Sequence, residues 1–187
     1  MRPRRLIVAM SGSSAPQFGR ALLEALRTIE PIETHLVLSA GARKTIELEL
    51  KVDPAEIEAM GDVVYRADDL AAAISSGSFI TMGMVIVPCS MRTLAAIATG
   101  HTSDLITRAA DVCLKERRRL VLVPRETPLN LIHIRNMETV TLAGATVLPP
   151  VPAFYHGPET IADLLNHVAG KVLDQFGIEH HLYRRWS

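Results

Sequence analysis

The segment LKERRRLVLVPRE, residues 114–126, holds the most informative junction of the chain. A charged stretch runs into the apolar residues 120–123, Pro124 ends that run, and Arg125 and Glu126 follow at once. A short apolar run ended by proline is typical of a buried β-strand. In open parallel α/β sheets, ligands bind outside the carboxyl ends of the strands. The junction therefore predicts a cation and a carboxylate side by side at the edge where active sites form.

Apolar runs of the same kind alternate with helical patterns along the whole chain. Strands are predicted at residues 6–10, 35–38, 62–65, 84–87, 120–123 and 145–148. Helices are predicted at residues 16–28, 42–50, 54–59, 94–98, 104–117, 129–140 and 160–176. Because the strands are almost continuously apolar, the pattern predicts an α/β fold whose parallel sheet is covered by helices on both faces.

The composition limits the class of protein. The chain has 187 residues, 48% of them hydrophobic and 21% charged, which suits one compact domain with a real core. Its formal net charge is +0, which argues against nucleic-acid binding by phosphate neutralisation. No apolar run approaches the ~20 residues that span a membrane, so we expect no membrane partner. Cys89 and Cys113, the two cysteines, form no disulfide framework or metal motif and favour a reducing cytoplasm.

Two hydroxyl-rich loops lie between a predicted strand and a predicted helix. One is Ser11-Gly12-Ser13-Ser14, and the other runs from Ser90 to Thr93. Hydroxyls and free N–H groups at a helix N-terminus can bind a phosphate or a flavin. They can equally be ordinary helix caps that need no ligand, and both readings stay open. Neither loop has the GxGxxG pattern, which disfavours a conventional NAD site.

A pair of cations lies on one predicted helix. Arg108 and Lys115 are seven residues apart, so they project about 20° apart on the same face, two turns along. Such a pair is either a wall for a phosphate or diphosphate or a solvated surface. Cys89 is interpreted as a buried thiol rather than a nucleophile. Trp186 indicates a packing partner for the C-terminal tail, and a neighbouring subunit is one candidate.

In combination, these motifs resemble the UbiX family of flavin prenyltransferases, and within it the phenylacrylic acid decarboxylase partner branch. The segments that carry the resemblance are ETHLVLSA (33–40), TIELEL (45–50), ISSGSF (74–79), PCSMRTLAAI (88–97), TRAADVCLKERR (107–118), LVLVPRETPL (120–129), PPVPAFYH (149–156), LDQFGIEH (173–180) and RRW (184–186). The resemblance covers nearly the whole chain. It implies a three-layer flavodoxin-like or Rossmann-like fold with a mostly parallel central sheet, in a single domain over residues 1–187 that typically assembles as a homododecamer.

The resemblance also implies the family's activity. It transfers a dimethylallyl group from dimethylallyl phosphate to N5 and C6 of reduced FMN, without a metal. The prenylated FMN then serves a separate UbiD-type aromatic-acid decarboxylase. Two alternatives remain open, a decarboxylase that uses FMN directly and a non-catalytic FMN carrier. The donor is left open between the monophosphate and the diphosphate.

Site residues are implied position by position. FMN contacts are expected at Gly12, Ser13, Ser14, Ser39, Ser90, Met91, Arg92, Thr93 and Arg125. The donor's phosphate is expected to meet Arg108, Lys115, Arg125, Tyr155 and Lys171, because cations and a hydroxyl stabilise a leaving phosphate. The expected catalytic residues are Glu126, Glu49 and Ser14, with Glu126 the better candidate for moving a proton. Trp186 matches an aromatic that closes the site from the tail, residues 177–187, which would pack on the active site or on a neighbouring subunit.

The first loop departs from the family pattern. The family usually has GASGA or GATGA, whereas this chain has Gly12-Ser13-Ser14-Ala15-Pro16. Proline is tolerated in the first turn of a helix. Alanine at position 15 is unfavourable only if the backbone there needs a positive φ. We therefore expect FMN binding to survive, while the effect on donor access near Ser14 stays open.

Overall fold

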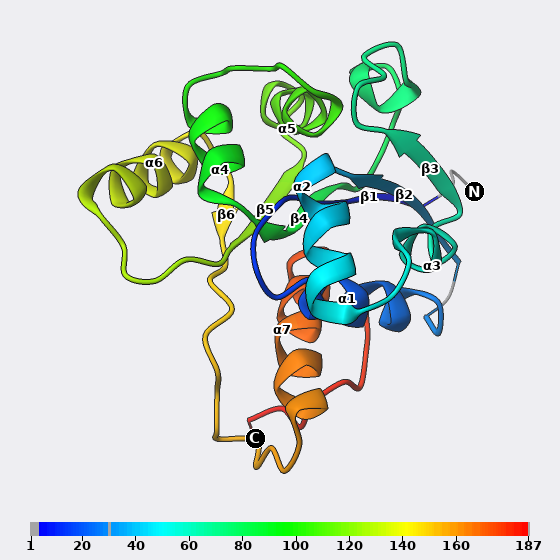
Figure 1. Ribbon diagram of the computed structural model, residues 1–187, viewed down its shortest axis with the longest axis vertical. Coiled ribbons are helices and arrows are strands. Elements are labelled where there is room, and N and C mark those ends of the chain that lie inside the picture. The colour runs from blue at the N-terminus through cyan, green and yellow to red at the C-terminus, as the bar shows by residue number, and fades with distance from the viewer. Residues whose placement is uncertain (1–3, 30, 187) are drawn as a thin grey trace.

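The computed structural model describes residues 4–29 and 31–186, and its framework is one six-stranded sheet (Figure 1). The strands are β1 (Arg4–Met10), β2 (Ile32–Leu38), β3 (Val63–Arg66), β4 (Gly83–Cys89), β5 (Arg119–Pro124) and β6 (Thr146–Val147). They lie in the order β3-β2-β1-β4-β5-β6, and every neighbouring pair is parallel. The predicted fold class is confirmed. This strand order places the reversal point, where doubly wound sheets bind ligands, between β1 and β4.

Helices cover both faces of this sheet. They are α1 (Gln17–Leu26), α2 (Ala40–Thr45), the π-helical turn η1 (Ile46–Leu50), α3 (Pro54–Glu58), the 3₁₀ turn η2 (Ala73–Ser75), α4 (Met91–Ala98), α5 (Leu105–Lys115), α6 (Leu131–Leu142) and α7 (Ile161–Gln175). Hydrophobic contacts place α1, α2, α3 and α7 on one face and α4, α5 and α6 on the other. No helix in the described ranges combines the length and apolar character that crossing a membrane requires.

One predicted helix is divided in the structure. The pattern at residues 42–50 predicts a single helix, but α2 passes into the wider turn η1, where the Lys51 N–H donates to the Ile46 carbonyl at 3.2 Å. Lys51 then ends the turn with φ +57°. Turns of this kind inside helices are frequent at functional sites. Here the turn carries Glu49.

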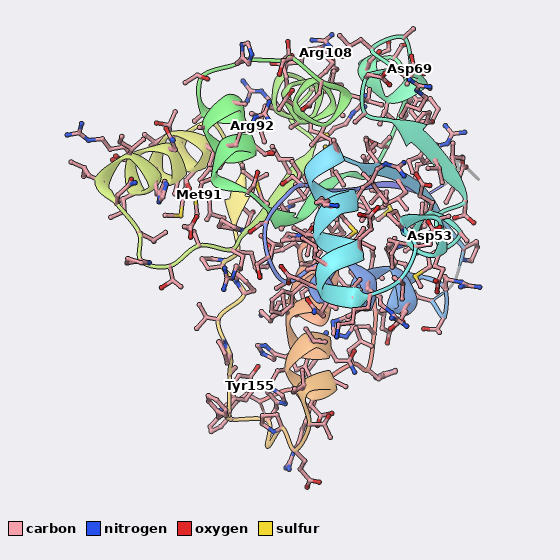
Figure 2. The ribbon with its side chains drawn as sticks, viewed as in Figure 1. Asp53, Asp69, Met91, Arg92, Arg108 and Tyr155 are labelled. Atoms are coloured by element: carbon pink, nitrogen blue, oxygen red, sulfur yellow. The ribbon has the colours of Figure 1, made fainter. Side chains whose placement is uncertain are left out.

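The C-terminal part of the chain forms an arm. Figure 1 shows α7 and the extended segment that follows β6 running away from the sheet together, with the C-terminus at the far end. Tyr155 lies on this arm, far from Met91 and Arg92 at the start of α4 (Figure 2). The last described residues fold back onto α7, where Asp174 accepts hydrogen bonds from Tyr183 at 2.6 Å and from Arg185 at 2.7 Å.

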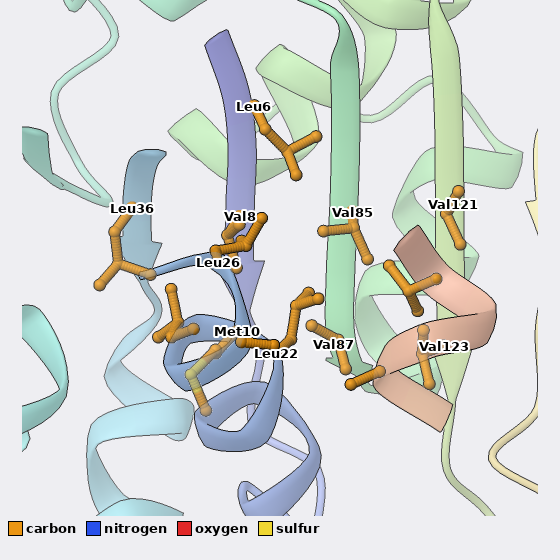
Figure 3. Packing of buried hydrophobic residues seen from close by; sticks show 14 of the residues in the cluster. Leu6, Val8, Met10, Leu22, Leu26, Leu36, Val85, Val87, Val121 and Val123 are labelled. Atoms are coloured by element: carbon orange, nitrogen blue, oxygen red, sulfur yellow. The ribbon is translucent and has the colours of Figure 1, made fainter. Parts of the chain in front are cut away.

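The alternation of side chains along the strands explains the two-sided core. In β1, Leu6, Val8 and Met10 are buried with α1 and α7, whereas Ile7 and Ala9 are buried with α4 and α5. Figure 3 shows the first of these clusters, with Val87 of β4 beside Leu22 of α1 and Val121 and Val123 of β5 beside α7. Full burial of each Val or Leu side chain contributes about 1.5–3 kcal/mol. The sheet is therefore a rigid support for the loops at its carboxyl edge.

Candidate functional site

A cleft of about 530 Å³ lies at the carboxyl edge of the sheet, where β1, β2, β4 and β5 end. Its lining includes many residues that the sequence predicts for the site, namely Gly12, Ser39, Ser90, Met91, Arg92, Thr93 and Glu126. Their convergence follows from the parallel topology, which brings the carboxyl ends of successive strands to one edge. Gly12 of the first hydroxyl-rich loop and Ser90 to Thr93 of the second therefore line the same cleft.

The first loop is fixed by hydrogen bonds to two neighbouring strand ends. The Ser11 hydroxyl donates to the Pro88 carbonyl at 3.2 Å and accepts from the Ser90 N–H at 2.8 Å. The Ser13 hydroxyl donates to the Arg125 carbonyl at 2.8 Å. Ser13 therefore holds the end of β5 in place with the hydroxyl that the resemblance assigns to FMN. Ser11, which the sequence did not assign to FMN or catalysis, has the same kind of supporting role.

Gly12 is required where two backbones meet. A Cβ atom on Gly12 would lie 2.8 Å from the Cα of Gly41, and one on Gly41 would lie 2.9 Å from the Cα of Gly12. No side chain fits at either position without moving the loop after β1 away from α2. Gly41 was missed by the sequence analysis, because only the folded arrangement brings it against Gly12.

Ser14 and Glu49, two of the expected catalytic residues, are hydrogen-bonded to each other. The Ser14 hydroxyl donates to Glu49 Oε2 at 3.1 Å, and the Ala15 N–H donates to the same oxygen at 2.8 Å. Ala15 has φ +70°, so this residue occupies the left-handed region that favours glycine. The backbone at position 15 therefore has the positive φ that makes alanine unfavourable there. Pro16 directly precedes α1, where its fixed φ suits the start of a helix.

Ala15→Gly should stabilise the folded protein by about 1 kcal/mol, because glycine adopts this φ without the Cβ clash. The measurement is the free energy of unfolding in urea at one fixed protein concentration. Ala95→Gly, within α4, is the matched control and should lower stability, since glycine weakens a helix interior. An Ala15→Gly variant less stable than the parent would contradict strain at this loop.

The second loop caps α4 and keeps its N-terminus open to the cleft. The Ser90 side chain accepts from the Thr93 N–H at 3.2 Å and donates to the Thr93 hydroxyl at 3.1 Å. The cap interpretation is therefore correct for Ser90. The cofactor interpretation is compatible with it, because the first N–H groups of α4 have no carbonyl within the helix and the helix dipole favours an anion there. Ser39 caps α2 in the same way, accepting from Ala42 N–H at 3.0 Å.

Arg125 and Glu126 follow β5 directly, as predicted, and both are exposed. Glu126 lines the cleft, and one of its oxygens accepts from the Thr127 N–H at 3.0 Å. The Arg125 backbone N–H donates to the Cys89 carbonyl at 3.4 Å. An exposed carboxylate at the rim of a cleft can exchange protons with a bound molecule and with water.

The remaining predicted cations do not meet in this cleft within one chain. Arg108 on α5 donates to the Ser75 carbonyl at 3.1 Å and pairs with Asp111 at 2.7 Å. Lys115 pairs with Glu116 and lines a larger cavity of about 1170 Å³ beside Arg119. Arg119 begins β5, so this cavity lies at the opposite edge of the sheet from Glu126. Within one chain Lys115 therefore lies apart from this cleft, and the role of Arg108 and Lys115 as one phosphate-binding wall stays a prediction.

Tyr155, Lys171 and Trp186 gather on the arm instead. The rings of Tyr155 and Trp186 are 6.0 Å apart in an edge-on arrangement, and Trp186 is 82% exposed. Lys171 Nζ lies 3.7 Å from Asp174. Burial opposes ionisation of Asp174, but hydrogen bonds from the tail, led by Arg185, lower the pKa of this carboxyl to about 2. The tail is thereby bound to α7 of its own chain.

The Tyr155 hydroxyl contacts a residue that the sequence analysis missed. Its oxygen lies 3.1 Å from Nε2 of His167, a buried residue of α7. Burial of the ring, with the charges of His156 and Lys171, lowers the pKa of His167. Helical spacing could place His167 only within α7, because its contact with Tyr155 depends on the path of the preceding loop.

Both cysteines are buried, which confirms the interpretation of Cys89 as a buried thiol. Cys89 and Cys113 are both free, and burial raises the pKa of each thiol to about 12. A thiol that stays protonated at neutral pH is a poor nucleophile. Neither cysteine is therefore suited to covalent catalysis.

Comparison with known proteins places this arrangement among flavin enzymes. The profile of the flavoprotein family matches residues 1–173. The chain is 54% identical over 183 residues to a probable UbiX-like flavin prenyltransferase of Streptomyces sp. (strain D7), covering 98% of this chain and 92% of that protein. It is 52% identical over 186 residues to the flavin prenyltransferase UbiX of Escherichia coli (strain K12), with 98% of each chain covered.

Solved structures agree with these relatives. The crystal structure of AnUbiX (PadA1) in complex with FMN and dimethylallyl pyrophosphate is similar with a TM-score of 0.97 and 51% identity, over 100% of this chain and 98% of that chain. A dodecameric FMN-dependent UbiX-like decarboxylase from Escherichia coli O157:H7 is similar with a TM-score of 0.95 and 51% identity, over 98% of this chain and 99% of that chain.

Proposed function

Because the chain belongs to the flavoprotein family, in its branch of UbiX-like flavin prenyltransferases, we propose that it transfers a dimethylallyl group from dimethylallyl phosphate to N5 and C6 of reduced FMN. The observation that carries the proposal is the cleft at the carboxyl edge. It combines an open helix N-terminus with the carboxylate of Glu126, on a backbone that matches the complex of a relative with FMN and a dimethylallyl donor.

The residues of the cleft fit FMN. Its volume lies within the roughly 300–1,000 Å³ of typical small-molecule sites. The start of α4 and the Arg92 side chain offer N–H donors and positive charge to a phosphate, and Ser39 lines the same cleft. Gly12 and Gly41 line the cleft and have no side chains that would project into it. Reduced FMN, when bound, supplies the nucleophilic N5 and C6 positions.

Two carboxylates then serve different tasks. Glu49 is held by the Ser14 hydroxyl and the Ala15 N–H, so it presents a fixed acceptor beside the first loop. Glu126 is exposed and held only by the backbone of its neighbour Thr127, so it can move a proton away from C6 during ring closure. Arg125 lies next to Glu126 and stabilises negative charge on the leaving phosphate.

Assembly would bring the remaining phosphate ligands into the site. Arg108, Lys115, Tyr155 and Lys171 lie outside the cleft of their own chain, so we assign them to sites completed by neighbouring copies. Apolar side chains are exposed on α6 and on the arm, where Leu142 and Trp186 are each 82% exposed. Exposed apolar surface of this kind marks interaction sites. We infer a homo-oligomer, a dodecamer like the Escherichia coli O157:H7 relative.

The proposal also includes the domain extent, the decarboxylase that receives the product, the cellular compartment and the prenyl donor. The chain acts as one flavoprotein domain over residues 1–187, of which residues 1–3, 30 and 187 lie outside the described residues. Its product is handed to a separate UbiD-type aromatic-acid decarboxylase. The two free buried thiols suit a reducing cytoplasm. Dimethylallyl phosphate is the proposed donor, and the diphosphate is the alternative to be tested beside it.

The deciding experiment is mass spectrometry of the flavin released after anaerobic incubation of the protein with reduced FMN and dimethylallyl phosphate. We expect a mass gain of one prenyl unit, and none when the donor is omitted. Unmodified FMN with both the mono- and diphosphate donors would overturn the proposal. Carbon dioxide release from an aromatic acid by the isolated protein would then favour a direct decarboxylase, and tight binding of unmodified FMN a carrier.

A further inference from the structure

The Tyr155 hydroxyl is held by one histidine. Its oxygen lies 3.1 Å from Nε2 of His167, and no other hydrogen-bond partner of this hydroxyl lies in the described part of the chain. Tyr155 itself is 49% exposed, whereas His167 on α7 is only 7% exposed. An exposed tyrosine on an extended loop is thus tied to a buried group on a long helix.

The His167 ring is fixed by its aromatic neighbours. It stacks on His156 with the ring centroids 4.8 Å apart and the planes 4° from parallel. Tyr183 lies 4.7 Å away, tilted by 57°, and the Tyr155 ring is edge-on at 5.7 Å. A partial rotation of the imidazole would break this packing. A half-turn of the ring would keep the stack but put a carbon in the place of Nε2, so the hydrogen bond to the Tyr155 oxygen selects the orientation with Nε2 toward it.

The other ring nitrogen decides which atom carries the hydrogen. Nδ1 of His167 is buried and has no hydrogen-bond partner among residues 4–29 and 31–186. A buried N–H without an acceptor is rarer and costlier than an unused lone pair. Burial lowers the pKa of His167, so the neutral ring with a single N–H is favoured at neutral pH. That hydrogen belongs on Nε2, which donates to the Tyr155 oxygen.

We propose that His167 is a positioning residue that orients the Tyr155 hydroxyl as a hydrogen-bond donor toward the phosphate of the prenyl donor. The Tyr155 oxygen accepts from His167, so the tyrosine's own hydrogen is free to point away from α7. A phosphate offers acceptors only, so this polarity is the one that binds it. The inference rests on the proposed function, which gives Tyr155 its phosphate.

A double-mutant cycle tests this role. His167→Phe keeps an aromatic ring in the stack and removes the donor, and Tyr155→Phe removes the hydroxyl. We expect kcat/KM for dimethylallyl phosphate to fall about fivefold in His167→Phe, the worth of one hydrogen bond, and about tenfold or more in Tyr155→Phe. The double variant should be no worse than Tyr155→Phe alone. His167→Gln should recover most of the loss in kcat/KM, because its amide can donate from a similar position. His156→Phe is the control: it keeps an aromatic ring in the stack, so its kcat/KM should stay within about twofold of the parent.

The outcomes separate the inference from the proposed function. Losses that multiply in the double variant would show a general packing effect and overturn the positioning role. Parental kinetics in His167→Phe beside an impaired Tyr155→Phe would overturn it while leaving the proposed function standing. Parental kinetics in Tyr155→Phe would remove the premise and overturn it with the phosphate role of Tyr155. A parent protein that forms no prenylated FMN would instead refute the proposed function.

Discussion

Glu126→Gln should lower the rate of prenylated FMN formation by about 10²–10⁴-fold, the usual contribution of a general acid or base. The amide has nearly the same shape as the carboxylate but cannot take up a proton at neutral pH. Glu126 lies at the rim of the cleft, and within the described residues its carboxylate accepts a hydrogen bond only from the adjacent Thr127 N–H. The substitution therefore leaves the loop after β5 intact, and FMN affinity should stay within a few-fold of the parent.

Two measurements separate these effects. Single-turnover formation of prenylated FMN gives the rate, and quenching of flavin fluorescence gives the FMN dissociation constant. Glu47→Gln is the matched control, because Glu47 is an exposed carboxylate that pairs with Lys44 and lies outside the cleft lining. Undiminished turnover in Glu126→Gln would remove the proton-transfer role. A parallel loss of FMN binding would show that Glu126 holds the flavin instead.

Local sequence patterns were sufficient to predict most of the strands and helices and the edge of the sheet at which the cleft lies. Apolar runs such as 84–87 and 120–123 define buried parallel strands, and the residues after each strand necessarily reach one edge of the sheet. For that reason the pattern places Ser90 and Glu126 at one edge of the sheet, whereas Ser39 was assigned to the site only through the family resemblance. The same logic explains why Arg125 and Glu126 were recognised from one junction.

Contacts between distant segments were beyond the reach of the sequence. The approach of Gly12 to Gly41 and the pairing of Tyr155 with His167 depend on how loops cross, which no periodicity encodes. Helical spacing correctly placed Arg108 and Lys115 on one helix, but it could not show that Lys115 lies at the opposite edge of the sheet. Residues that act across subunits carry no mark of this in the pattern of a single chain.

Ala15 shows a second limit of prediction from sequence. The sequence reveals that alanine replaces the family's glycine, but whether alanine is strained there depends on the backbone φ of residue 15, which only the structure gives. The structure gives φ +70°, and the Ala15 N–H still reaches Glu49. The loop thus keeps its hydrogen bond at the cost of local strain, which is why a gain in stability is expected for glycine there.

Gly12→Ala should weaken FMN binding by about 5- to 150-fold and destabilise the fold by about 1–3 kcal/mol, the usual range for overpacking. The new methyl group would lie 2.8 Å from the Cα of Gly41 and 3.0 Å from its carbonyl carbon. These are backbone atoms, so the clash is relieved only if the loop after β1 and the start of α2 move apart. Both segments line the cleft, and their separation would displace Ser39 from Ser90.

Two further variants distinguish crowding from general strain. Gly41→Ala places its methyl 2.9 Å from the Cα of Gly12, so it should produce the same loss of FMN affinity from the other side of the contact. Gly100→Ala is the control, because φ is +68° there but no atom lies within 4 Å of the added methyl group. It should lose stability through backbone strain and keep its FMN affinity. Equal FMN binding in the parent and in Gly12→Ala would mean that this backbone contact does not shape the flavin site.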